Sequence, residues 1–166
     1  MTDATEFAPG LMIRGITAPQ KLSDYKLIAF DMDSTLITIE CIDEIADATG
    51  KKEEVAAITE ATMRGEITDF KDSLRQRVGK LGGVTEADMA RVLAERLKLS
   101  PGAETLVKAA KAAGLKVLLV SGGFTYFAEH VRALLDIDFV RANVLESKDG
   151  VLTGGLVERA WGDICD

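Results

Sequence analysis

The sequence predicts an α/β fold, in which a parallel sheet is interrupted after its first strand by a helical insert. Compact apolar runs at 27–30 and 115–120 indicate strands, and each breaks abruptly into polar residues or glycines. Between them, apolar residues recur at helical spacing. Runs that are apolar on both faces suit a parallel sheet covered by helices, joined by right-handed crossovers. We therefore expect a core formed by residues 1–38 and 99–166, and a small helical cap formed by residues 39–98.

The N-terminal half supplies the first core strand and the helical cap. Residues 11–16 predict a short edge strand, and a polar loop then leads into the first core strand. Within the cap, the apolar spacing indicates about four short helices. One of them starts at Thr85, because Thr85 and Asp88 form a capping-box pattern.

The C-terminal half is expected to complete the core. Its elements are, in order, a helix at 101–113, a strand at 115–120, a glycine turn at 121–123, a second helix, a strand around 139–140 and a hairpin that turns at 148–150. Ser100 followed by Pro101 marks the start of the first helix, since serine is a common N-cap and proline suits the first helical position.

The composition argues against several classes of protein. The 166 residues include 27 acidic and 20 basic side chains, which gives a formal net charge of −7. An acidic surface repels nucleic-acid phosphates and anionic lipids, so neither is expected as a partner. The two cysteines, Cys41 and Cys165, lie far apart and indicate neither a zinc site nor a disulfide framework. The sequence shows neither a secretory leader nor a membrane-spanning run, so we expect a cytoplasmic protein.

Chemically active residues follow the two most apolar strands. Asp31 and Asp33 come directly after the first strand, and Ser121 and Gly122 follow the second. Ligands of open α/β sheets bind beyond the carboxyl ends of the strands. Two close carboxylates repel unless a cation relieves them, and Mg²⁺ binds such pairs together with phosphate oxygens, while a helix start suits an anion. Taken singly, the first motif is equally a solvated acidic turn and the second a simple connecting turn.

In combination and order, the motifs resemble those of the phosphoserine phosphatases of the haloacid dehalogenase superfamily. The stretches DMDSTLITIECIDEIAD, SLRQRV, LKVLLVSGGFTYFA and LTG carry the resemblance, which extends from Leu27 to Gly154. It implies a Rossmann-like core with a cap inserted after the first core strand. It also implies Mg²⁺-dependent hydrolysis of O-phospho-L-serine to L-serine and phosphate, the last step of serine biosynthesis.

The resemblance implies roles for the residues at the strand ends. Asp31 would attack phosphorus and form an aspartyl-phosphate. Asp33 would protonate the leaving serine oxygen and later take a proton from water. The Asp31 carboxylate and the Asp33 backbone carbonyl would hold Mg²⁺, and Ser121 and Gly122 would hold the phosphate oxygens.

The resemblance also implies that the helical cap recognises the amino acid. Glu40 would face the substrate ammonium, Arg77 its carboxylate, and Met63 and Phe70 would line the pocket. Arg77 has independent support, because it falls on the apolar side of its expected helix, where a charge needs a partner. The alternatives are an arginine whose head reaches solvent from a helix edge and, for Glu40, a carboxylate that only favours a helix start.

The resemblance further implies a lysine that pairs with the phosphate and the nucleophile, and a later GDGxND segment whose aspartates complete the magnesium shell. This sequence contains no counterpart of that lysine and no GDGxND segment. We expect the sequence to be a C-terminally truncated version of an active enzyme, in which the last part of the core is missing. A natural truncation that binds but hardly reacts, and a second chain that supplies the missing edge, are the alternatives. The first core strand would then be an exposed apolar edge, through which the chain is expected to form homo-oligomers.

Two other functions compete with phosphoserine hydrolysis. The chain is alternatively a phosphatase for another small phosphomonoester, or a phospho-accepting domain with almost no turnover, comparable to a receiver domain. A hydrolase that uses a Ser-His-Asp triad is disfavoured, because the only histidine, His130, lies in an expected helix away from Ser121. We expect His130 to be structural.

Overall fold

The computed structural model describes residues 4–17 and 19–157, and Cys165 lies outside these ranges. Its strands are β1 (Thr5–Ala8), β2 (Leu11–Ile13), β3 (Leu27–Phe30), β4 (Lys116–Phe124), β5 (Phe139–Asn143), β6 (Leu145–Lys148) and β7 (Val151–Leu156). Its α-helices are α1 (Cys41–Ala48), α2 (Lys52–Met63), α3 (Phe70–Lys80), α4 (Glu86–Glu95), α5 (Ala103–Ala112) and α6 (Thr125–Leu135). A 3-10 turn, η1 (Leu22–Asp24), and a π-helical turn, η2 (Met32–Leu36), complete the described elements.

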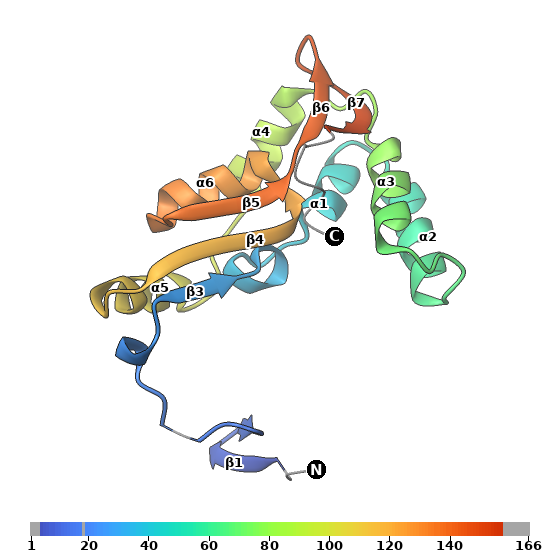
Figure 1. Ribbon diagram of the computed structural model, residues 1–166. Coiled ribbons are helices and arrows are strands. Elements are labelled where there is room, and N and C mark those ends of the chain that lie inside the picture. The colour runs from blue at the N-terminus through green and yellow to red at the C-terminus, as the bar shows by residue number, and fades with distance from the viewer. Residues whose placement is uncertain (1–3, 18, 158–166) are drawn as a thin grey trace.

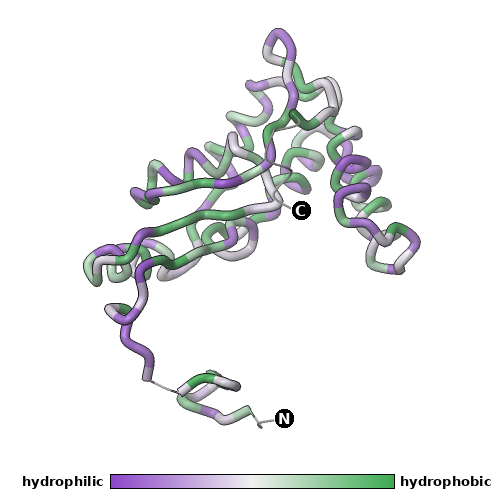
Figure 2. The backbone as a smooth tube through the Cα atoms, in the orientation of Figure 1, coloured by the Kyte–Doolittle hydropathy of each residue, from purple (hydrophilic) through white to green (hydrophobic). Residues whose placement is uncertain are grey.

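The three expected core strands form a parallel sheet, as predicted, and the structure gives their order as β3-β4-β5. Leu27 lies opposite Lys116 and Phe30 opposite Leu119, so β3 and β4 end near each other. Along β4, Val117 and Leu119 are fully buried, while Leu118 and Val120 are only half-buried. This alternation shows that the described helices cover one face of the sheet, the face on which α5 and α6 lie in Figure 1. The apolar run of β4 is evident in Figure 2.

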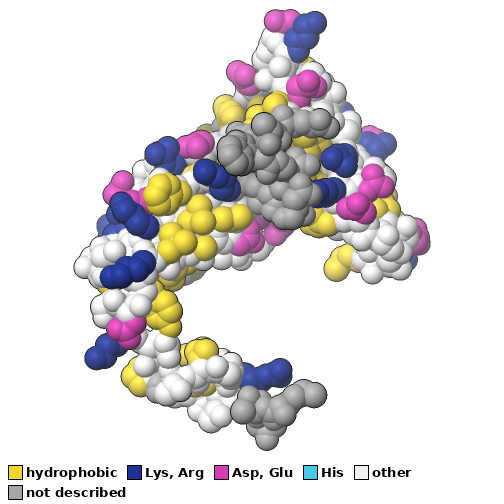
Figure 3. All heavy atoms as spheres, viewed as in Figure 1, with side chains coloured by type: hydrophobic (Ala, Val, Ile, Leu, Met, Phe, Trp, Pro, Cys, Tyr) yellow, Lys and Arg dark blue, Asp and Glu magenta, His cyan; other side chains and the backbone are white. Residues whose placement is uncertain are grey.

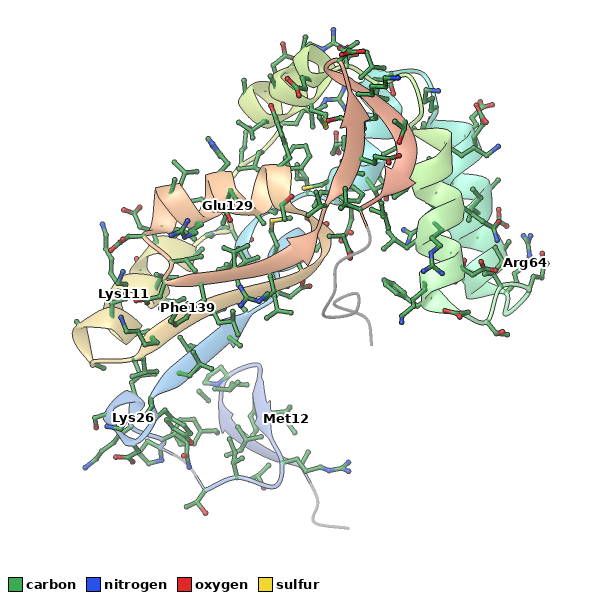
Figure 4. The ribbon with its side chains drawn as sticks, turned by 45° about the horizontal axis from the view of Figure 1, so that its top comes forward. Met12, Lys26, Arg64, Lys111, Glu129 and Phe139 are labelled. Atoms are coloured by element: carbon green, nitrogen blue, oxygen red, sulfur yellow. The ribbon has the colours of Figure 1, made fainter. Side chains whose placement is uncertain are left out.

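The opposite face of the sheet differs from the expectation of a sheet covered on both sides. Leu27 on β3 and Phe139 on β5 are each 49% exposed. Figure 3 views this face and shows hydrophobic side chains gathered over the strands. Phe139 points outward from the sheet in Figure 4. Among the described strands, β3 is an edge of the sheet, as predicted.

The helical cap contains the expected helices α1 to α4. The chain enters and leaves it at one place, because Ile37 bridges Leu99 in antiparallel fashion. Asp69 caps α3 through the backbone amide of Lys71. The predicted capping box of α4 is confirmed, since the Thr85 hydroxyl accepts from the Asp88 amide and the Asp88 carboxylate accepts from the Thr85 amide.

The predicted hairpin is confirmed as β6 and β7, and it packs against the cap. The Gly83 amide donates to the Leu152 carbonyl at 2.9 Å, and the Leu152 amide donates to the Val84 carbonyl at 2.8 Å. Figure 1 shows the hairpin rising from the end of β5 towards α3 and α4. The segment after the third core strand thus anchors the helical cap.

Two predictions about element positions are wrong. The strand expected at 11–16 is the shorter β2, which pairs with β1 in a separate hairpin and not with the main sheet; Figure 1 shows this hairpin apart from the core. The helix expected from Pro101 begins at Ala103 instead. Its N-cap is Gly102, whose φ of 88° places it in the left-handed region that glycine adopts without strain.

The expected glycine turn at 121–123 is also wrong, because β4 continues through it to Phe124. The following helix, α6, starts only at Thr125. Ser121 and the glycines therefore lie at the end of a strand and not at a helix start. Within the described parts of the chain, no helix has the length and apolar character needed to cross a bilayer.

Candidate active site

A pocket of about 220 Å³ lies where β3 and β4 end, between the sheet and the helical cap. All of the predicted site residues except Met63 line it. The lining residues are Asp31, Asp33, Glu40, Ile42, Phe70, Leu74, Arg77, Ser121, Gly122, Gly123 and Phe124. The fold thus brings together acids from the end of β3, a hydroxyl and glycines from the end of β4, and a cation from α3.

The turn after β3 places both aspartates at the pocket. Asp31 Oδ1 accepts a hydrogen bond from the Met32 amide at 2.8 Å, which starts the π-helical turn η2. The Ile37 amide closes the turn on the Met32 carbonyl at 3.1 Å. Inside the turn, Ser34 has a φ of 52°, a left-handed value that is uncommon for residues other than glycine. Met32 is fully buried and anchors the turn in the core.

Asp33 has a raised proton affinity. Burial raises its pKa from 3.8 to about 6, and the negative charges of Glu40 and Asp31 add to the rise, while hydrogen bonding from Cys41 opposes it. Its Oδ1 atom is buried without a hydrogen-bond partner. A carboxyl group whose pKa lies close to neutral pH suits a general acid, and an unpartnered oxygen is available to a ligand.

A bulge at the end of β4 shapes the second side of the pocket. The pairing of β4 with β5 shifts register between Val120 and Phe124. Within the bulge, the Gly123 amide donates to Ser121 Oγ at 2.9 Å. The Asn143 side-chain amide, on the buried end of β5, donates to the Gly122 carbonyl at 2.8 Å. These two bonds fix the conformation of the bulge, as such irregularities often do next to active sites.

The two sides of the pocket meet at Gly123. A Cβ atom at this position would lie 3.0 Å from Asp33 Oδ2 and 3.2 Å from Met32 Cε. These contacts are tighter than most Cβ contacts, so a side chain here would push against the Asp33 carboxyl group and the Met32 methyl group, and glycine lets the end of β4 approach them closely. At Gly122, a Cβ would meet the Phe70 ring at 3.5 Å, which shows how closely the helical cap approaches the bulge.

Arg77 is the cationic side chain that α3 brings to the pocket. Its Nε is buried and has no hydrogen-bond partner. It follows Leu74 by one helical turn, and both residues line the pocket. A buried guanidinium donor without a partner costs free energy, which indicates that an acceptor is supplied by a ligand.

Glu40 immediately precedes α1 but does not cap it, since its side chain accepts no capping hydrogen bond. Its Oε1 atom instead accepts a hydrogen bond from the Ser34 hydroxyl at 2.6 Å. Glu40 therefore belongs to the pocket and is not simply a helix-start carboxylate.

The structure contradicts the prediction for Met63. This residue ends α2, is 85% exposed and does not line the pocket. The next residue, Arg64, lies at the outer end of the α2 and α3 pair in Figure 4. The physical reason is the length of α2, which carries Met63 away from the strand ends. Phe70, at the start of α3, does line the pocket and is 51% exposed.

Several residues at the site were not predicted. Gly123 and Phe124 continue the Ser121-Gly122 motif, and their positions directly after it could have indicated them. Ile42 and Leu74 are apolar residues of α1 and α3. The contact from Asn143 has no signal in the sequence, because it depends on the pairing of β5 with β4. His130 is half-buried on α6 and does not line the pocket.

The donor set of the pocket fits a magnesium ion. Asp31 and Asp33 both line it, and the unpartnered Asp33 Oδ1 leaves this carboxyl group free to interact with an ion or its bound water. Within residues 4–17 and 19–157, no group of three or more His, Cys, Asp or Glu side chains is placed so that it could hold a metal ion. Mg²⁺ commonly uses one or two carboxylates and completes its shell with water and phosphate oxygens.

Comparisons with known proteins agree with this geometry. The family model for haloacid dehalogenase-like hydrolases matches residues 25–162. The chain is 65% identical over 162 residues to the phosphoserine phosphatase of Albidiferax ferrireducens, which covers 98% of this chain and 68% of that protein. It is also 65% identical to the phosphoserine phosphatase of a Polaromonas species, with 98% of this chain and 69% of that protein covered.

Solved structures give the same picture. A substrate-bound phosphoserine phosphatase superimposes with a TM-score of 0.72 at 40% identity, covering 79% of this chain and 61% of that one. A phospho-aspartyl intermediate analogue of phosphoserine phosphatase superimposes with a TM-score of 0.72 at 41% identity, covering 79% and 62%. The chain thus spans about two thirds of the length of its relatives. It belongs to the haloacid dehalogenase-like hydrolase family and, within that family, to the phosphoserine phosphatases.

Proposed function

We propose that this pocket hydrolyses O-phospho-L-serine to L-serine and phosphate with the help of Mg²⁺. The observation that carries the proposal is the buried Arg77 Nε without a partner, on the cap side of a pocket whose other side is formed by Asp31, Asp33 and Ser121. Such a pocket suits a small ligand that has both a carboxylate and a phosphate. Phosphoserine has both, together with an ammonium group.

Each charged group of phosphoserine has a matching group in the pocket. Arg77 would bind the carboxylate through its planar set of donors. Glu40 would bind the ammonium group. The Ser121 hydroxyl and the Gly122 amide would bind phosphate oxygens and direct phosphorus towards Asp31. The apolar ring of Phe70 lies against the bulge and would cover this end of the substrate.

The reaction would proceed in two steps through the aspartates. In the first, an Asp31 carboxylate oxygen attacks phosphorus, the bond to the serine oxygen breaks, and Asp33 gives its proton to that oxygen. In the second, Asp33 takes a proton from water, whose oxygen attacks phosphorus and releases phosphate from Asp31. The raised pKa of Asp33, about 6, supports both roles, because the carboxyl group can hold and release a proton near neutral pH.

The Asp31 carboxylate and the Asp33 backbone carbonyl would hold the magnesium ion. When bound, Mg²⁺ supplies positive charge that offsets the charges of the phosphate and of Asp31. This role is consistent with a pocket that places two carboxyl groups next to an anion site.

The nucleophile is tested by phosphate release from phosphoserine. We expect wild-type protein to release phosphate only with Mg²⁺, and Asp31→Asn to abolish the release. Asp43→Asn, an exposed aspartate on α1, is the matched control and should leave the rate unchanged. Activity retained in Asp31→Asn would refute Asp31 as the nucleophile.

The substrate class is tested separately, because another small phosphomonoester is the alternative. Phosphoethanolamine lacks the carboxylate that Arg77 would bind. We expect wild-type protein to prefer phosphoserine, and Arg77→Met to lose most of this preference. Lys80→Met, an exposed lysine later in α3, should keep it. Equal use of the two substrates by wild-type protein would favour the alternative.

A phospho-accepting domain without turnover is the second candidate. It is compatible with the two acids at the end of β3, Asp31 and Asp33, which line the pocket. It predicts that phosphoserine leaves one phosphoryl group on each protein molecule and no steady release of phosphate. The phosphatase proposal predicts multiple turnovers. For either activity, the location that we propose is the cytoplasm, as the composition led us to expect.

A further inference from the structure

The Ser34 side chain does not line the pocket itself but contacts Glu40, which does. Its hydroxyl donates to Glu40 Oε1 at 2.6 Å. Its backbone amide donates to the Ile39 carbonyl at 3.1 Å, which closes the loop between η2 and α1. Both bonds join Ser34 to the segment that carries Glu40, so the two residues form one local unit.

The backbone at Ser34 is unusual for its residue type. With φ at 52° and ψ at 13°, it occupies the left-handed region, which glycine enters at lower cost. Glycine at this position would relieve the strain but would remove the hydroxyl. The presence of serine in a strained conformation therefore points to a use for its side chain.

Glu40 has few other constraints. It is exposed, and its carboxylate does not cap α1. A flexible glutamate loses side-chain freedom when it binds a ligand, and this loss weakens the interaction. The hydrogen bond from Ser34 fixes one carboxylate oxygen in advance and leaves the other oxygen for a ligand.

We propose that Ser34 is a positioning residue that sets the preference for substrates with an ammonium group, because it holds Glu40 in the orientation that binds this group. The proposal rests on the proposed function, in which Glu40 binds the ammonium of phosphoserine. Ser34 itself does not need to touch the substrate. Its removal should therefore weaken the binding of phosphoserine and leave unchanged the binding of a ligand that lacks the amino group.

The test compares two ligands by titration calorimetry. One is O-phospho-L-serine, and the other is the phosphate ester of 3-hydroxypropanoate, which is phosphoserine without its amino group. All variants are made in an Asp31→Asn background, so that neither ligand is consumed. We expect Ser34→Ala to weaken the binding of phosphoserine about tenfold, as is usual for a lost hydrogen bond to a charged group, and to change the binding of the second ligand less than about twofold.

Two further variants separate positioning from folding. Ser34→Gly removes the hydroxyl and also relieves the left-handed backbone, so it should lose the preference without losing thermal stability. Thr38→Ala removes another hydroxyl from the same segment, one that donates to the Lys98 carbonyl and not to Glu40, and should keep the preference.

The outcomes distinguish the two proposals. If the Asp31→Asn protein with Ser34 intact binds both ligands equally, Glu40 does not recognise the ammonium group. The proposed substrate and the proposed role of Ser34 are then both refuted. If the background protein prefers phosphoserine and both Ser34 variants keep this preference, only the role of Ser34 is overturned. If both ligands weaken to the same extent in the Ser34 variants, Ser34 supports the pocket as a whole, and its role in specificity is refuted.

Discussion

Two charged side chains in the pocket, Asp33 and Arg77, lie where burial makes their charges costly. Asp33 has a pKa raised to about 6, and Arg77 has a buried donor without a partner. Neither arrangement stabilises the ligand-free fold. Both become favourable when a substrate or an ion supplies the opposite charge, so the protein gives up some stability for function at these positions.

The raised pKa of Asp33 predicts a pH-dependent stability in metal-free protein. The folded state holds the proton more tightly than the unfolded state, so the contribution of Asp33 to stability falls as the pH rises from about 4 to about 6. Asp33→Asn removes the cost of burying the charge. We expect the variant to be more stable than wild type at pH 8, by at most about 3 kcal/mol, and to keep only about half of this advantage at pH 5.

Denaturant unfolding at both pH values, in the presence of a chelator, measures this difference. Asp43→Asn on the exposed side of α1 should show no comparable rise between pH 5 and pH 8. A difference between Asp33→Asn and wild type that does not depend on pH would show that charge burial is not its cause.

Among individual residues, the sequence predicted the charged side chains of the pocket but not every apolar residue that lines it. Asp31, Asp33 and Arg77 were predictable because acids after an apolar strand and a cation on an apolar helix face both lack an obvious structural use. Met63 was predicted for the pocket and is exposed, because its position depends on the length and direction of α2. The position of a residue at the end of a helix depends on the length and direction of the whole helix, and the local sequence pattern does not determine these.

Among the secondary-structure elements, the bulge in β4 does most to shape the proposed anion site. Glycines before a helix suggested a helix start as the anion site. The structure instead places Ser121 and Gly122 at a strand end, held by Asn143 from β5. Strand pairing between segments far apart in the sequence decides where β4 ends. Local sequence patterns do not contain this information, so the motif was predictable and its geometry was not.

The buried Asn143 should support phosphate binding through this bulge. Asn143→Ala removes the hydrogen bond to the Gly122 carbonyl and leaves that partly buried oxygen without its partner. We expect a loss of stability of about 1–2 kcal/mol and a weaker affinity for inorganic phosphate. Denaturant unfolding and phosphate titration measure the two effects.

Thr153→Ala, which removes a hydroxyl from the exposed hairpin, is the control and should leave phosphate affinity unchanged. If Asn143→Ala lowers stability while phosphate affinity stays at the wild-type value, the bulge does not depend on Asn143 for its binding geometry.

The whole molecule has an unusual distribution of apolar surface. The parallel sheet, the four cap helices and the hairpin all follow from hydrophobic periodicity and turn residues, and the structure confirms them. The described helices cover only one face of the sheet, and β3 is an edge with Leu27 half exposed. How the faces of a sheet are covered depends on packing across the molecule, which is why the sequence suggested two covered faces.

The exposed edge predicts self-association of the chain. An unpaired apolar strand at a sheet edge tends to pair with another chain, and a lysine at such an edge opposes this pairing. We expect sedimentation velocity to show association that increases with protein concentration, and Leu27→Lys to reduce it. Leu106→Lys, at an exposed position on α5, is the control and should not. A monomer at all concentrations would contradict the prediction.

The proposed reaction requires Asp31 to accept a phosphoryl group from the substrate. Intact-mass measurement, after brief incubation with phosphoserine and Mg²⁺ and an acid quench, tests it most directly. We predict a species heavier by one phosphoryl group, with the added mass located at Asp31 by fragmentation and absent from Asp31→Asn. Phosphorylation at another residue, or phosphate release by wild type with the same extra mass in Asp31→Asn, would contradict the claim.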